Sequence, residues 1–322
     1  MKLKISPYSF LLLFSIPLLA ELKYFPKDKD ELLELVKNES IKLDEIDTSK
    51  ITDMSYLFCL ARDNSRSYPY EEGCGRVFRK DFKGIEKWDV SNVEDMARMF
   101  DSVENFNEPI GKWDVSNVKN MKLMLSGATS FNQPLDKWNV SKVENMCAMF
   151  EQATLFNQPL NSWDVSNVKD MSSMFSGAKS FNQSLNSWDV SSVKDMSAMF
   201  SHTLFNEPLD KWNVSNVKDM SSMFSGAKSF NQSLNSWDVS SVKDMSWMFK
   251  NAKAFNQPLD KWDVSNVEDM TKIFNGAKSF NQDLSMWKAL KLKGWGAWKE
   301  MFEGSPLEKD KAKRFVNPRI RQ

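Results

Sequence analysis

The stretch WDVSNVKDMSSMFSGAKSFNQSLNS, residues 163–187, decides the fold because close copies of it fill most of the chain. Its tryptophan recurs every 25 residues, apart from one interval of 24. The column of equivalent tryptophans is Trp88, Trp113, Trp138, Trp163, Trp188, Trp212, Trp237, Trp262 and Trp287. Residues 165–197 and 214–246 are identical, which indicates a recent duplication of a two-repeat block. A fixed period of this length is typical of a repeat architecture.

The apolar residues of the unit predict how each coil is built. Leu185, Trp188 and Val190 follow the spacing L-x-x-W-x-V, which resembles the core pattern of a leucine-rich repeat. We therefore expect a short strand at Trp-Asp-Val, with alternate side chains pointing inward. The following segment, residues 171–181, places methionine and phenylalanine at spacings of three and four, which predicts a short helical turn. Gly177 is expected to end that turn in a left-handed conformation.

One such unit cannot bury its apolar face alone, so we expect about ten coils to stack into a continuous core. The predicted fold class is an α/β repeat solenoid, leucine-rich-repeat-like, with a short strand and a short helical turn in each 25-residue coil. Caps are expected at both ends: an amphipathic helix over 27–37, and a basic segment in which Trp287, Trp295, Trp298 and Phe302 cover the last coil. The predicted parts are a signal peptide (1–20), an N-terminal cap helix (21–45), the repeat solenoid (46–286, with an inserted loop at 59–81) and a C-terminal cap (287–322).

The amino terminus has the layout of a secretory signal peptide. Lys2 and Lys4 precede an apolar run from Phe10 to Ala20, which is too short for an ordinary membrane-spanning helix. We predict an exported protein, secreted or on the cell surface, with the periplasm and an uncleaved anchor as alternatives. No stable membrane insertion is expected after cleavage.

The repeated motif also resembles a known family. Phe131–Leu135 reads FNQPL and Trp163–Val168 reads WDVSNV. Joined as FNQPL-x-x-WDVSNV-x-DM-x-x-MF, they resemble the BspA-type leucine-rich-repeat surface proteins of bacteria over roughly residues 46–285. The resemblance implies a secreted or surface solenoid used for attachment and protein recognition.

Charge and composition exclude several function classes. The 322 residues contain 43 basic and 43 acidic side chains, which argues against a nucleic-acid binder. His202 is the single histidine, so histidine-based metal centres are not expected. We predict no cofactor and no metal site. Every acidic side chain of the repeats has copies, whereas a catalytic carboxylate pair is singular, so the chain is predicted not to be an enzyme.

Two polar columns accompany the core. The residue before the first methionine of each unit is Asp or Asn, and we expect these side chains to accept hydrogen bonds from the turn backbone. Stacked carboxylates also leave calcium binding open. The paired methionines could hold Cu(I) but are interpreted as core.

The second polar column surrounds each tryptophan and supplies the predicted binding site. Side chains between the inward positions of Trp-x-Val point outward onto the expected sheet face, which forms an extended strip of mixed charge. The candidate partner-binding residues are Lys87, Asp89, Lys112, Asp114, Lys137, Asn139, Asp164, Asp189, Lys211, Asn213, Asp238, Lys261 and Asp263. Solenoids use such extended surfaces for binding.

Three cysteines remain. Cys59 and Cys74 flank an insertion, and we predict a disulfide between them in an exported protein. Cys147 has no partner in the sequence pattern and is interpreted as a partly buried free thiol.

Together these observations predict a monomeric, non-enzymatic solenoid that binds a protein partner. A carbohydrate-binding or carbohydrate-cleaving solenoid and a self-associating spacer are the alternatives.

Overall fold

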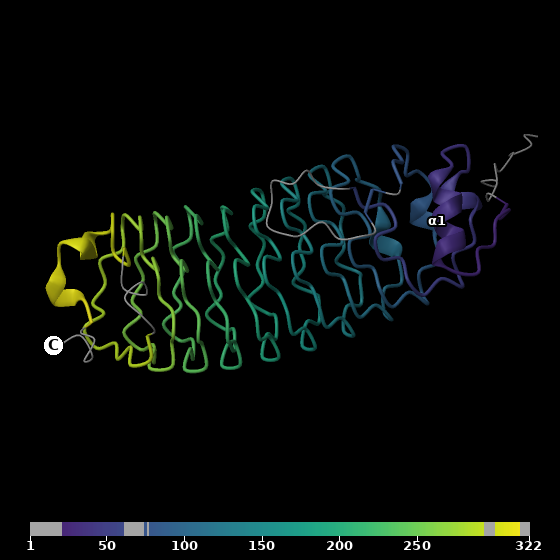
Figure 1. Cartoon of the computed structure of the whole chain (residues 1–322). Helices are drawn as coiled ribbons and strands as arrows, with labels where there is room; N and C mark the ends of the chain where they lie inside the picture. The colour runs from purple at the N-terminus through teal and green to yellow at the C-terminus, as the bar shows by residue number, and fades with distance from the viewer. Residues whose placement is uncertain (1–20, 61–73, 76, 293–299, 316–322) are drawn as a thin grey trace, which may run out of the picture.

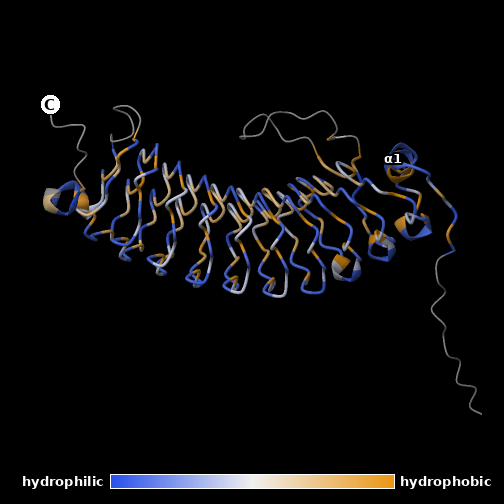
Figure 2. Ribbon diagram, turned by 90° about the horizontal axis from the view of Figure 1, so that it is seen from below, coloured by the Kyte–Doolittle hydropathy of each residue, from blue (hydrophilic) through white to orange (hydrophobic). Residues whose placement is uncertain are grey.

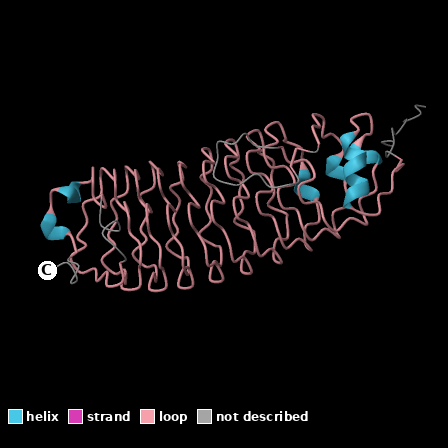
Figure 3. Ribbon diagram, viewed as in Figure 1, coloured by secondary structure: helices cyan, strands magenta, loops and turns pink. Residues whose placement is uncertain are grey.

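Successive coils of the chain lie side by side in one long stack (Figure 1). The computed structural model describes residues 21–60, 74–75, 77–292 and 300–315. The predicted signal peptide, most of the inserted loop, Trp295 and Trp298 therefore lie outside the described residues. Within the described part, helices occur only in the first coils and at the C-terminal end, and turns connect everything between them (Figure 3).

Helix α1 (Lys29–Lys37) lies at the N-terminal end of the stack, inside the range predicted for a cap helix. It begins where the Asp28 side chain accepts a hydrogen bond from the Glu31 backbone N–H, a common N-cap arrangement. It buries Leu32, Leu33 and Val36 against the first coils. The bounds of the short 3-10 helices are η1 (Leu43–Glu45), η2 (Ile85–Lys87), η3 (Ile110–Lys112), η5 (Pro306–Glu308) and η6 (Lys311–Lys313).

The C-terminal end of α1 is held by the buried guanidinium of Arg79. Its nitrogens donate to the carbonyl oxygens of Val36, Asn38 and Ile41, at 3.3, 3.3 and 2.6 Å. The last carbonyls of a helix have no partner inside the helix, and a cation there is favoured by the helix dipole. Arg79 thus joins the segment that follows the inserted loop to the N-terminal helix.

One continuous core runs through the coils. The predicted inward columns of Leu, Trp, Val, Met and Phe are buried throughout, and each tryptophan of the repeat column is only 2–4% exposed. Equivalent rings stack on one another, such as Phe150 on Phe175 at 5.7 Å and Trp163 on Trp188 at 6.4 Å between ring centroids. The methionine pairs are part of this core.

The expected strand at Trp-Asp-Val is wrong for the described coils. Parallel bridges between coils form instead at the Asp or Asn before the first methionine. The bridged residues are Asp53, Asp95, Asn120, Asn145, Asp170, Asp195, Asp219, Asp244 and Asp269. Near the tryptophan, Trp188 N–H donates to Leu185 O and Val193 N–H to Val190 O, so tight turns flank the segment. The tryptophan side chain makes the connection between coils there: Trp188 Nε1–H donates to Leu160 O at 2.9 Å.

The expected helical turn after the bridge is also wrong. Met171, Ser173 and Phe175 donate their backbone N–H groups to the next coil, whereas the residues between them donate back within their own coil. Ser173 and Gly177 have φ values of +56° and +70°, which a right-handed helix does not allow. The left-handed conformation expected of Gly177 is confirmed. We call residues 169–177 and their equivalents the ladder segments, and their exposed surface the ladder face.

The stack bends into an arc (Figure 2). Hydrogen-bonded parallel strands lie about 4.8 Å apart, and bridged ladder segments follow that spacing. The distance between equivalent ring centroids is 5.7 Å for Phe150 and Phe175 and 6.3 Å for Trp138 and Trp163. Neighbouring coils are thus closer together at their ladder segments than at their aromatic rings, and a stack with this difference in spacing curves toward its closely spaced side. The ladder face therefore lies on the concave side and the tryptophan column toward the convex side.

The C-terminal segment continues the stacking. Phe274 N–H donates to Met301 O, and Gly276 N–H to Glu303 O, in the pattern of a further ladder segment. The Phe302 ring stacks on Phe274 at 6.0 Å.

Candidate functional site

The thirteen side chains of the predicted partner-binding strip are all exposed. They flank the buried tryptophans and so lie toward the convex side. They do not lie on a hydrogen-bonded sheet face, because the bridges between coils run through the ladder segments. The predicted location on a sheet face is thus corrected, while the strip itself remains a continuous polar surface. We call it the polar strip.

The acidic residues of the polar strip have a local structural role. Asp89 Oδ1 accepts hydrogen bonds from Ser91 N–H at 3.0 Å and from the Ser91 hydroxyl at 2.7 Å. Asp189 and Asp238 each accept a hydrogen bond from the backbone N–H of the serine two residues later. Hydrogen bonds from the serine stabilise the charged carboxylate, and they lower the pKa of Asp189 and of Asp238. The turn after Trp-Asp-Val therefore explains the Asp or Asn, but it does not explain the lysine before the tryptophan.

The ladder face carries the other acidic column. Each Asp or Asn accepts the backbone N–H two residues later, as predicted; Asp170 Oδ1 to Ser172 N is 2.9 Å. Burial raises the pKa of Asp195 and outweighs the opposite effect of the hydrogen bonds from Ser197. The negative charges of Asp219 and Asp170 in the neighbouring coils raise this pKa further. In the described residues no group of three His, Cys, Asp or Glu side chains is placed to hold a metal ion.

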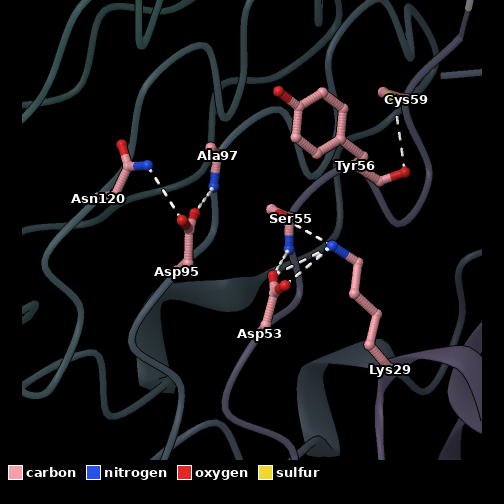
Figure 4. A network of polar contacts seen from close by, with 8 residues as sticks. All are labelled: Lys29, Asp53, Ser55, Tyr56, Cys59, Asp95, Ala97 and Asn120. Carbon is pink, nitrogen blue, oxygen red and sulfur yellow. Dashed lines mark hydrogen bonds and ion pairs between the residues drawn. The ribbon is translucent and has the colours of Figure 1, made fainter. Parts of the chain in front are cut away.

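The N-terminal part of the ladder face has its charges paired (Figure 4). Lys29 from α1 contacts Asp53 at 3.1 Å and donates to the Ser55 hydroxyl at 2.6 Å. One coil further, Asn120 Nδ2 donates to Asp95 at 3.1 Å. An asparagine thus replaces a carboxylate where two would otherwise repel each other.

The cysteines and the histidine occupy structural positions. Cys59 and Cys74 form a disulfide with a Cα–Cα distance of 4.9 Å. Cys147 is a buried free thiol, and burial raises its pKa, which disfavours the reactive thiolate. The His202 ring lies over Gly226 of the next coil.

The sequence pattern had not indicated a column of hydrogen bonds between coils in the FNQ motif. The side-chain oxygen of Asn132 accepts the Asn157 backbone N–H at 3.0 Å and the Gln158 side-chain N–H at 3.1 Å. The same contact recurs from coil to coil through Asn107, Asn132, Asn157, Asn182, Asn206, Asn231, Asn256 and Asn281. The presence of asparagine in every unit was the signal, because an amide oxygen at the same place in each coil can accept the backbone N–H of the next coil.

The described geometry offers no route to sugar binding through the tryptophan column, since these indoles are buried and their N–H groups are used within the stack. No described helix has the length and apolar character needed to span a membrane.

Comparison with known proteins supports the repeat organisation. No curated protein matches the chain at a significant level. Four overlapping stretches, residues 74–186, 135–222, 156–255 and 202–315, match the family described as Mycoplasma protein of unknown function, DUF285. Because the matches together cover most of the chain, the protein belongs to this repeat family.

Proposed function

We propose that the chain is an exported, non-enzymatic solenoid, similar to the BspA-type leucine-rich-repeat proteins, that binds a protein partner through its polar strip. The observation that carries this proposal is the exposure of the strip in eight successive coils. Its lysines project from positions that the fold does not require to be basic, because serine occupies the same column in other coils. Those serines are Ser162, Ser187 and Ser236.

The repetition of the two acidic columns from coil to coil supports a binding role over an enzymatic one. Both acidic columns repeat along the stack, and both are occupied with turn hydrogen bonds. An extended surface of alternating charge suits a polar protein ligand better than a nucleic acid, which favours uncompensated positive charge.

The test replaces four strip lysines by the serine that the column already tolerates: Lys112→Ser, Lys137→Ser, Lys211→Ser and Lys261→Ser. Proteins bound to the immobilised wild type from surface and secreted fractions are identified, and the affinity of each purified partner for the variant is measured. We expect a loss of about tenfold or more, with an unchanged unfolding temperature.

The matched control removes the same charge from another exposed column. Lys179, Lys228, Lys253 and Lys278 become threonine, which occupies that column at Thr129 and Thr154. Binding should survive in the control. Equal losses in both variants would show a net-charge effect, and no loss in either would exclude the polar strip.

A further inference from the structure

Trp247 is an exposed aromatic side chain on the ladder face. It is 39% exposed, whereas every tryptophan of the repeat column is buried. It belongs to the column of left-handed residues, which holds Tyr56, Arg98, Leu123, Ala148, Ser173, Ala198, Ser222, Trp247, Lys272 and Glu300. The three coils before it carry only serine and alanine at this position, so an indole here departs from the repeat.

The departure begins where the two identical blocks end. The second copy stops at Ser246, and the next four residues are Trp247-Met-Phe-Lys250. After the first copy the equivalent residues are Ala198-Met-Phe-Ser201. The buried Met and Phe are kept, and only the first and fourth residues differ. An aromatic residue and a cation therefore occur together against an otherwise repeated background.

The core does not account for this indole. Trp247 has a φ of +62°, a conformation that bulky residues rarely adopt and that costs about 1–2 kcal/mol relative to the right-handed region. Because the Trp247 side chain is only partly buried, burial of its apolar surface does not fully offset this backbone strain. The same positive φ recurs at this position in every described coil, so the strain belongs to the fold and only the choice of tryptophan is particular to this coil.

Two lysines lie at the ring. Lys250 Nζ is 3.9 Å and Lys272 Nζ is 5.4 Å from the ring centroid. Lys272 also pairs with Glu300 at 2.7 Å. Lys250 makes no ion pair within the described part of the chain, so its charge is available to a ligand.

The neighbouring coils provide room beside the indole. Toward the N-terminus the residues at these two positions are small: the half-buried Ser222 and the buried Ser225 in the adjacent coil, and the half-buried Ala198 and the buried Ser201 in the coil before. A peptide can follow this low, polar surface and still reach the ring and Lys250.

We propose that Trp247 and Lys250 anchor a second docking site, for an acidic peptide segment in which a carboxylate stands next to an aromatic or aliphatic side chain. The indole supplies apolar area, as tryptophan does at the centre of protein interfaces, and Lys250 binds the carboxylate. The inference rests on the proposed role in protein binding, but it uses a different surface from the polar strip.

The experiment measures binding of fluorescein-labelled glutamate–tyrosine copolymer to the full chain by anisotropy. The variants are Trp247→Ala and Lys250→Ser, which reproduce Ala198 and Ser201, the equivalent residues after the first block. Each should weaken binding by about tenfold, with unfolding temperatures close to wild type. Polyglutamate, which lacks the ring, should bind more weakly than the copolymer.

The strip variant separates this inference from the proposed function. The four Lys→Ser changes in the polar strip should leave copolymer binding intact. If copolymer binding is unchanged by Trp247→Ala and Lys250→Ser, or is lost only in the strip variant, the docking site is wrong while partner binding by the strip stands. Preference for a lysine–tyrosine copolymer would also overturn the proposal.

Discussion

Residues 165–197 and 214–246 have the same sequence and occupy different places in the stack, and they adopt the same conformation. The ring centroids of Phe175 and Phe181 are 4.0 Å apart, as are those of Phe224 and Phe230. Their left-handed residues agree within two degrees, as Gly177 at +70° and Gly226 at +68° illustrate. The sequence of a coil, packed between others of its kind, is therefore sufficient to set its backbone.

The two blocks differ in what they contact at their borders. Gly177 lies beneath Gln152 of the preceding coil, and Gly226 lies beneath His202. Lys169 forms an ion pair with Glu144, whereas the residue one coil before Lys218 is another lysine. The core columns thus set the shape, while the neighbouring coils set the chemistry of the surface.

The glycine contacts also show that the structural unit is a pair of coils. A Cβ on Gly177 would lie 2.4 Å from Gln152 Nε2, and one on Gly226 would lie 2.6 Å from His202 Nδ1. Along this left-handed column the residues are Ser102, Gly127, Gln152, Gly177, His202, Gly226, Asn251, Gly276 and Gly304. No two residues with side chains follow each other, and the side chains of Gln152, His202 and Asn251 occupy the space that the next glycine leaves.

The largest expected effect comes from breaking that alternation. Deletion of residues 165–189 rejoins Asp164 to Val190 and keeps the repeat motif, but it places Gln152 next to His202. Two side chains then compete for space that fits one, which should cost about 1–3 kcal/mol beyond the loss of the coil. Urea unfolding monitored by circular dichroism measures the difference.

Deletion of residues 140–164 is the matched control. It also removes 25 residues and keeps the motif, yet it brings Gly127 next to Gly177, where no side chains collide. This variant should be clearly more stable than the first, and removal of the whole pair, residues 165–213, should be tolerated as well. Equal stability of both single-coil deletions would refute the two-coil unit.

A smaller effect is expected where the same substitution is made in both blocks. Alanine at Gly177 or Gly226 takes on a left-handed backbone, which costs about 1–2 kcal/mol. The Gln152 side chain is flexible at its end and can move away, whereas the His202 ring has less freedom. Gly226→Ala should therefore be the more destabilising change in thermal unfolding.

His202→Ala provides the control for that difference. It removes the ring but keeps a residue with a Cβ at a left-handed position. In its background the cost of Gly226→Ala should fall to that of Gly177→Ala. If the two glycine variants cost the same with His202 present, the ring does not limit the space.

The core columns could be predicted from the sequence because the period of Leu, Trp, Val, Met and Phe is a direct consequence of burial. The position of the ladder could not, because either Trp-Asp-Val or the segment after it satisfies the apolar spacing. The left-handed residue between the methionines decides between the two segments. Ser173 and Ala198 occupy this position, and neither is a glycine that would have indicated a left-handed backbone in the sequence. The polar strip followed from its place beside the buried tryptophans, whereas Trp247 stood out only once its exposure and the cations beside it were known.

The smallest effect concerns equivalent carboxylates of the two blocks and depends on pH. Burial raises the pKa of Asp195 and of Asp244, and flanking aspartates raise both further. A carboxyl group whose pKa is higher in the folded chain lowers stability as the pH rises from about 3.9, its unfolded value, through the folded value. Asp195→Asn and Asp244→Asn should therefore stabilise the protein at pH 7 and have no effect below about pH 3.9. Asparagine keeps the oxygen that accepts the backbone N–H, as Asn145 does in its own coil.

Asp189→Asn in the same block should have the opposite sign. Hydrogen bonds from Ser191 lower the pKa of Asp189, so its charge contributes stability above the unfolded pKa, and this contribution is lost as the pH falls. Thermal unfolding between pH 3 and pH 8 would show the Asp195 and Asp189 variants diverging in opposite directions from wild type as the pH rises. If the unfolding temperatures of the wild type and the two variants changed with pH in parallel, neither carboxylate would have a shifted pKa in the folded chain. The repulsion along the stacked aspartates would then be screened by solvent.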